Sequence, residues 1–236
     1  EGRRYGPAPI PCAGEAVRDT ETRPSPAWMA GLAPAEPALA RYASPTSLGE
    51  GSPAPASSPL AAAGGLGRYR RGELIHRLLQ LLPDIAPDRR AEAARRLLGR
   101  ERDLTEDQRA EMAQAALGVL GDSRFAAVFG PGSRAEVALA GVAERLPAGL
   151  AISGRVDRLL VEADRVLVVD FKTNRPAPGR IEDADDAYVT QMALYWALLA
   201  DIYPGRVVEA ALVWTDGPRL MPIPPSRLEE ALAKLR

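Results

Sequence analysis

The sequence predicts an α/β domain in which a mixed central sheet is flanked by helices, preceded by a proline-rich linker. Residues 1–66 contain 11 of the 22 prolines, and segments rich in proline, alanine, glycine and serine rarely build a packed core. From residue 67 the patterns run as helices, three strands, a helix, a strand and a helix. That order is typical of a mixed sheet covered by helices.

The linker is expected to span residues 1–66, partly extended or disordered, and the folded domain residues 67–236. The chain begins with Glu1 rather than Met, which fits a piece of a longer protein or a processed one. The first helix is predicted in 68–82, where apolar residues from Ile75 to Leu82 recur at helical spacing.

Two further helices are predicted in 88–99 and 105–120, and Thr105 with Gln108 forms a capping-box pattern. The remaining predicted elements, in chain order, are strands in 134–142, 149–163 and 165–173, a helix in 187–203, a strand in 207–215 and a helix in 225–236.

Charged residues interrupt the apolar second and third strands. These strands read as a hairpin with its turn at Ala163 and Asp164, which places Asp157 directly opposite Asp170 on one face. Lys172 shares that face, about 6.6 Å further along. A turn one residue longer would offset the aspartates diagonally. Carboxylates about 5 Å apart repel by about 3 kcal/mol at an effective dielectric constant of about 20, so the pair needs compensation.

A divalent cation would compensate the pair most directly, because carboxylate oxygens suit Mg²⁺. A shared proton or Lys172 are other means, and an ordinary ion pair of Lys172 with one aspartate is the simpler alternative. Glu136, at the start of the preceding strand, is a further candidate acid or a solvated strand end. His76 is the only histidine. Gly72, four residues earlier, leaves room for a ligand or another backbone.

These residues together resemble the RecB-type branch of the PD-(D/E)xK nuclease superfamily over residues 67–236. The matching segments are "GELIH" (72–76) for the G-x-x-x-H helix, "GRVDRLL" (154–160) for the first metal aspartate, "VVDFKT" (168–173) for the D-x-K core and "QMALYW" (191–196) for the Q-x-x-x-Y motif. The resemblance implies a restriction-endonuclease-like fold.

The resemblance also implies roles for individual residues. The implied metal ligands for Mg²⁺, which Mn²⁺ would replace, are Asp157, Asp170, the backbone carbonyl of Phe171 and His76. The implied catalytic residues are Asp157, Asp170, Lys172 and Glu136. The implied DNA-binding residues are Gln191 and Tyr195. Arg68, Arg70, Arg71 and Arg77 lie close in sequence to the expected mouth of the site and are candidate phosphate contacts, of which we assign Arg70 and Arg77 to DNA binding, with a solvated basic face as the alternative.

Within this superfamily, the sequence of residues 154–178 and 188–205 most resembles the C-terminal nuclease domains of AddA-type helicase–nucleases, which act in bacterial double-strand-break repair by recombination. This implies a Mg²⁺-dependent DNA exonuclease, a helicase portion upstream in the same polypeptide, and an AddB-like second subunit. No "GKT" or "GKS" phosphate loop occurs here. With one cysteine, Cys12, no iron–sulfur cluster is expected.

Composition narrows the remaining possibilities. The net charge is −1, so no overall basic field indicates nucleic acid or membrane, although a cleft can carry its own field. The single cysteine, the lack of a signal core and the absence of an apolar run near 20 residues lead us to expect a cytoplasmic protein without membrane contact. The resemblance to AddA-type enzymes implies a bacterial one. The alternatives are a stand-alone RecB-like nuclease, a catalytically silent scaffold that binds DNA or a partner, and a structural domain with surface ion pairs.

Overall fold

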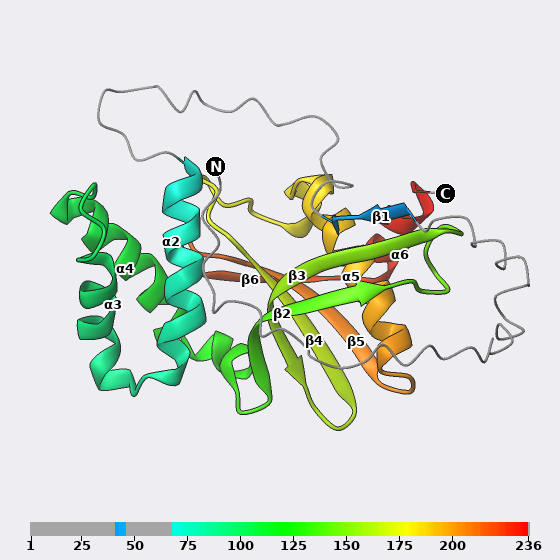
Figure 1. Ribbon diagram of the computed structural model, residues 1–236, viewed down its shortest axis with the longest axis horizontal. Coiled ribbons are helices and arrows are strands. Elements are labelled where there is room, and N and C mark those ends of the chain that lie inside the picture. Colours follow the sequence, from blue (N-terminus) through cyan, green and yellow to red (C-terminus); the bar gives the residue numbers. More distant parts are fainter. Residues whose placement is uncertain (1–40, 46–67, 236) are drawn as a thin grey trace, which may run out of the picture. The chain divides into compact units, whose positions relative to one another are not determined.

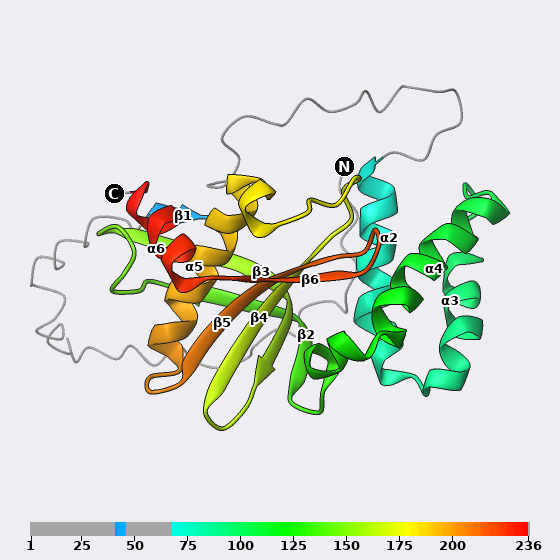
Figure 2. The same ribbon diagram turned by 180° about the vertical axis from the view of Figure 1, so that it is seen from behind.

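The computed structural model describes residues 41–45 and 68–235, which form a mixed sheet with helices on both faces (Figures 1 and 2). The helices are α2 (Arg68–Leu81), α3 (Arg90–Leu98), α4 (Glu106–Gly121), α5 (Asp186–Ile202) and α6 (Pro225–Ala233). The strands are β1 (Arg41–Ala43), β2 (Ser133–Gly141), β3 (Leu150–Val161), β4 (Arg165–Lys172), β5 (Val207–Trp214) and β6 (Arg219–Ile223). The predicted fold class is confirmed.

The sheet has a gap along one edge of β3. The strand order is β1-β3-β4-β5-β6, with β2 also paired to β3. β2 runs along β3 from Ile152 to Leu160, so the other edge is shared by β1, at Leu150–Ile152, and β4, at Arg158–Val161. Residues 153–157 therefore have no strand partner on that edge among the described residues.

Two apolar cores lie on opposite faces of the sheet. Val166 and Val168 of β4 pack with α5 and α6, whereas Leu167 and Val169 pack with α2 and α4. This alternation is expected of a strand covered on both faces. Asp170 is in step with Val168 and so belongs to the face that carries α5.

Local sequence signals explain several helix ends. In the capping box of α4, the Gln108 backbone N–H donates to Thr105 Oγ1 at 3.3 Å, and the Thr105 N–H donates to Gln108 Oε1 at 2.9 Å, as predicted. At the start of α5, Asp185 accepts from the Ala187 N–H at 2.9 Å. Its end at Ile202, before Pro204 and Gly205, also agrees with the sequence.

Two strands were not predicted. β6 contains Pro222 and lies at the sheet edge, where a residue without an N–H is tolerated. β1 lies within the predicted linker. The rest of residues 1–66 is outside the described residues, so the linker and its boundary stay a prediction. No helix in the described part of the chain is long and apolar enough to cross a membrane.

Candidate active site

The two aspartates lie where β3 and β4 separate. The hairpin has the predicted register, since Arg158 pairs with Val169 and the Glu162 N–H donates to the Arg165 carbonyl at 2.9 Å. The ladder stops there, however, and Asp157 and Asp170 are not paired across it. Instead, Asp157 Oδ2 accepts the Phe171 backbone N–H at 2.7 Å. A carboxylate thus replaces the missing strand partner.

Asp170 is buried beside Lys172. Its Oδ2 lies 2.7 Å from Lys172 Nζ, and the two side chains are 9% and 11% exposed. That oxygen has no aligned hydrogen-bond donor, so the ammonium balances its charge without satisfying it fully. Burial, followed by the charge of Asp157, raises the pKa of Asp170 even though Lys172 opposes the shift. The site therefore disfavours the uncompensated carboxylate.

His76 reaches the same gap from the other helical layer. Its Nδ1 lies 3.3 Å from Asp157 Oδ1, and its ring meets the edge of Phe171 at 6.0 Å between centroids. Burial lowers the pKa of His76, but the hydrogen bond to Asp157 and the charges of Asp157 and Asp170 outweigh it and raise that pKa above its ordinary value. Because the sheet is open here, α2 and α5 can both supply side chains.

Helix α5 holds the ammonium of Lys172. Nζ donates to Gln191 Oε1 at 3.2 Å and lies 3.8 Å from the ring centroid of Tyr188. The Tyr188 hydroxyl in turn accepts from Asn174 Nδ2 at 2.7 Å. Sequence reasoning missed Tyr188, although its place one turn before Gln191 on the same helix was the available signal.

Tyr195 lies outside the cleft. It is 2% exposed, and its hydroxyl donates to the Arg155 carbonyl at 2.9 Å, on the unpaired edge of β3. Burial and the charge of Asp170 raise the pKa of Tyr195 to about 12. A side chain added to Gly154 would meet this hydroxyl at 2.5 Å and Pro45 Cδ at 2.9 Å. In this structure Tyr195 is buried against the unpaired edge of β3 and does not line the cleft.

Three other predicted residues are also placed away from the cleft. Glu136 sits at a φ of 54°, in the left-handed region, and its Oε2 lies 3.6 Å from Arg155 Nη1. Arg70 pairs with Glu73 and Glu101, and Arg77 Nη1 lies 3.6 Å from Glu101 Oε1. The arginine that does line the cleft is one that the sequence did not single out, Arg155, whose side chain is 65% exposed.

These side chains surround a cleft of about 370 Å³. Its lining includes the predicted residues His76, Asp157, Asp170, Phe171, Lys172 and Gln191, together with Arg155, Thr173, Asn174, Ala187 and Tyr188. The two predicted aspartates, the lysine, the histidine and the glutamine are thus brought together, without Glu136, and the hairpin register accounts for the aspartates and the lysine.

The donor set fits a hard divalent cation. Asp157 and Asp170 supply carboxylates, and the Phe171 carbonyl faces the same side of β4 as its N–H, towards Asp157. His76 adds a nitrogen. Among the described residues no three His, Cys, Asp or Glu side chains are already grouped as a metal-ligand cluster. Asp170 Oδ2 is a buried oxygen without a hydrogen-bond partner in the described part of the chain, and a bound cation would supply the missing interaction.

The site thus lies in a sheet that helices cover on both faces, with an acid pair and a lysine where β3 and β4 separate. The family model described as the PD-(D/E)XK nuclease superfamily matches residues 53–232. This chain therefore belongs to the PD-(D/E)XK nuclease superfamily.

Other comparisons are more distant. Among curated proteins none matches the chain. A putative exonuclease from Eubacterium rectale is similar over 66% of this chain and 63% of its own, with 16% identity and a TM-score of 0.43. The protein SSO0001 is similar over 68% of this chain and 73% of its own, with 15% identity and a TM-score of 0.29. The chain thus spans less than two thirds of the exonuclease, and both likenesses are too distant to indicate shared activity.

Proposed function

We propose that this chain is a metal-dependent nuclease domain that hydrolyses phosphodiester bonds in DNA. The observation that carries the proposal is the assembly of Asp157, Asp170 and Lys172 in one cleft at the break between β3 and β4. Hydrolysis of a phosphodiester needs charge stabilisation on the phosphate and an activated water, and two acids with a cation and a lysine supply both.

In this mechanism Asp157, Asp170, His76 and the Phe171 carbonyl would hold Mg²⁺, or Mn²⁺ in its place. The bound ion would polarise the scissile phosphate and lower the pKa of water. Lys172 would then leave Asp170 but remain in the cleft, because Gln191 and the Tyr188 ring also hold its ammonium. From there it would stabilise negative charge that develops on the phosphate or orient the attacking water.

Substrate would enter along the exposed side chain of Arg155, which is the arginine of the cleft lining. A guanidinium there can contact a phosphate next to the one being cut. With a net charge of −1, the chain is expected to bind DNA weakly, and more weakly as salt concentration rises.

The test is cleavage of end-labelled single-stranded DNA by the 236-residue chain in Mg²⁺, Mn²⁺ or EDTA. Cleavage should need metal and vanish in Asp170→Ala, and Lys172→Ala should slow it by about 10²–10³-fold. Glu209→Gln is the matched control, because Glu209 pairs with Arg165 at 3.5 Å at the far end of β4. Exonuclease action further predicts that circular single strands resist cleavage.

Each result has a definite meaning. Cleavage that persists in EDTA or in Asp170→Ala would refute the proposal. Metal binding without cleavage would keep the site and point to a missing motor that delivers the strand. If the chain neither binds metal nor cuts, the silent-scaffold alternative replaces the nuclease.

We also propose that the domain is the exonuclease module of an AddA-type helicase–nuclease in double-strand-break repair, with an AddB-like partner. The support is the sequence of residues 154–178 ("GRVDRLLVEADRVLVVDFKTNRPAP") and of residues 188–205. These segments resemble that family at further positions besides the four motifs. The coding sequence upstream of Glu1 tests it. A helicase phosphate loop in the same reading frame is expected, and a start codon directly before Glu1 would favour a stand-alone nuclease instead.

A further inference from the structure

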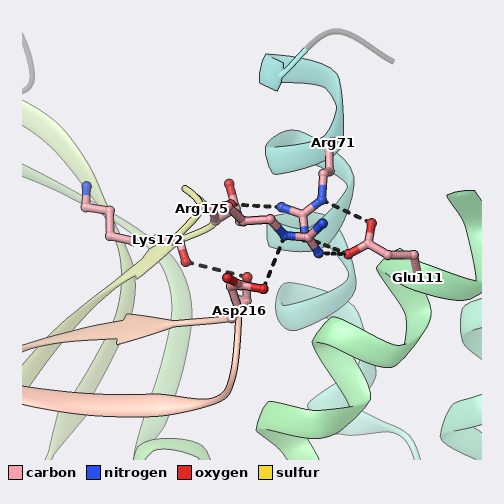
Figure 3. Close-up of polar contacts among 7 residues, drawn as sticks. Arg71, Glu111, Lys172, Arg175 and Asp216 are labelled. Atoms are coloured by element: carbon pink, nitrogen blue, oxygen red, sulfur yellow. Dashed lines mark hydrogen bonds and ion pairs between the residues drawn. The ribbon is translucent and has the colours of Figure 1, made fainter. Parts of the chain in front are cut away.

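An ion-pair network joins α2 and α4 to the segment that follows β4 (Figure 3). Glu111 of α4 accepts two hydrogen bonds from Arg71 of α2: Nη2 to Oε1 at 2.7 Å and Nε to Oε2 at 3.1 Å. Arg175, which follows β4, also donates to Glu111 and pairs with Asp216 at 3.2 Å. Neither Arg71 nor Glu111 lines the cleft.

Arg71 also binds the chain directly after the lysine of the site. Its Nη1 donates to the Thr173 carbonyl at 2.8 Å. On the other side, the Thr215 N–H donates to the Lys172 carbonyl at 3.0 Å. The backbone of Lys172 and Thr173 is therefore held from α2 and from β5, while the side chain of Lys172 points into the cleft.

Helix α2 approaches Thr173 closely at Gly72. A Cβ atom on Gly72, the residue after Arg71, would lie 3.0 Å from Thr173 Oγ1. Glycine permits this approach, and the Arg71 contacts hold the helix there. His76 lies five residues after Arg71, about 7.5 Å along the same helix axis. A helix is stiff over that length, so the position of Arg71 sets that of His76.

The network has the properties of a positioning device. The Arg71 side chain is 16% exposed and that of Glu111 36%, and a two-pronged arginine–carboxylate contact fixes direction as well as distance. Burial alone would raise the pKa of Glu111. The hydrogen bond and charge of Arg71 and the charge of Arg175 outweigh it and lower that pKa, so the carboxylate stays ionised at neutral pH.

We propose that Arg71 and Glu111 are positioning residues, which place His76 of α2 against Asp157 and hold the end of β4 for metal binding. This inference rests on the proposed metal-dependent function. Lysine in place of Arg71 would keep the charge but could not reach Glu111 by two donors and the Thr173 carbonyl by a third. The geometry of the arginine, not its charge alone, is therefore required.

The experiment is calorimetric titration of Mn²⁺ into the 236-residue chain, its Arg71→Ala, Arg71→Lys and Glu111→Gln variants, and the control Glu209→Gln. Loss of groups that orient metal ligands typically weakens metal affinity by about 10–100-fold, and that loss is expected for Arg71→Ala and Glu111→Gln. Arg71→Lys should lie between Arg71→Ala and wild type, and Glu209→Gln should match wild type.

A double-mutant cycle with His76→Ala then tests the route of the effect. Since Arg71 acts partly through His76 and partly through the end of β4, Arg71→Ala should weaken Mn²⁺ binding by a smaller factor once His76 is gone. Wild-type affinity in Arg71→Ala, or an undiminished further loss in the His76→Ala background, would overturn the inference. So would a higher KM for DNA with unchanged Mn²⁺ affinity, since Arg71 would then contact substrate. A wild-type chain that binds no Mn²⁺ would instead refute the proposed function itself.

Discussion

Asp170→Asn separates an ion pair from a metal site, because the two explanations predict different changes in stability. If Asp170 serves only as the partner of Lys172, the substitution leaves a buried ammonium without its counter-charge. At 2.7 Å and an effective dielectric constant of about 20, the lost attraction is about 6 kcal/mol before solvation is counted. Breaking a buried pair costs about 3–5 kcal/mol net. In a domain of this size that lowers Tm by about 6–20 °C.

The metal site predicts no such fall. The pKa of Asp170 is raised by burial and by Asp157 in spite of Lys172, so at pH 7 its charge is a net cost to the folded state. Asparagine removes that cost, and Lys172 keeps Gln191 as an acceptor. The Tm of Asp170→Asn in EDTA should equal or exceed that of wild type.

Thermal unfolding in EDTA and in Mn²⁺ measures both effects. Metal at about 100 times its Kd should stabilise wild type by about 2.7 kcal/mol, a rise in Tm of about 5–10 °C, and Asp170→Asn should show no rise. A fall of about 6 °C or more for Asp170→Asn in EDTA, combined with no response of wild type to metal, would refute the metal-site reasoning and leave the ion pair.

Three further expectations concern neighbouring groups. Tyr188→Leu removes the ring that lies over the Lys172 ammonium, an interaction worth about 1–2 kcal/mol, and should lower kcat about 5- to 30-fold. Tyr188→Phe keeps the ring and should keep most of the rate. Equal kcat values for Tyr188→Leu and wild type in steady-state assays would contradict this. Gly154→Ala should lower the free energy of unfolding in urea by about 1–3 kcal/mol, because the added methyl group meets the Tyr195 hydroxyl. Tyr195→Phe removes that hydroxyl, so it should lower the free energy of unfolding less in the Gly154→Ala background than in wild type. Additive losses of unfolding free energy would count against the close contact. The pKa of Glu111 lies below its ordinary 4.5, so the ionised carboxylate stabilises the fold above about pH 4.5, and this contribution disappears as pH falls through the folded-state pKa. The difference in free energy of unfolding between wild type and Glu111→Gln should follow the same pH course. A difference that persists in acid would contradict the ion pairing of Glu111.

The predictable part of the site came from strand periodicity. Alternation in β4 and a two-residue turn at Ala163 and Asp164 suffice to put Asp157, Asp170 and Lys172 close together, and the structure agrees on register. The separation of β3 from β4 was not predictable in this way, because no proline or glycine in "VVDFKT" marks it. It depends on Asp157 accepting the Phe171 N–H, a contact that periodicity does not encode.

Residues outside the hairpin were harder to place for a different reason. Proximity in sequence suggested that Arg70 and Arg77 would face DNA, but both pair with Glu101, an acid in a loop that lies 31 residues after Arg70. Glu136 stands opposite Asp157 by register, yet its left-handed φ interrupts the strand there. Arginine partners and single backbone angles are decided by tertiary packing, which a local pattern does not report.

The strand β1 has a practical consequence for anyone who prepares this domain. The predicted linker boundary suggests a polypeptide that starts at residue 67, but that choice would delete β1, which pairs with Leu150–Ile152 of β3. The exposed edge would then offer backbone N–H and C=O groups between apolar side chains, a template on which a second molecule can add its own strand. A polypeptide that begins ahead of Arg41 should therefore stay monodisperse at concentrations where the shorter one precipitates.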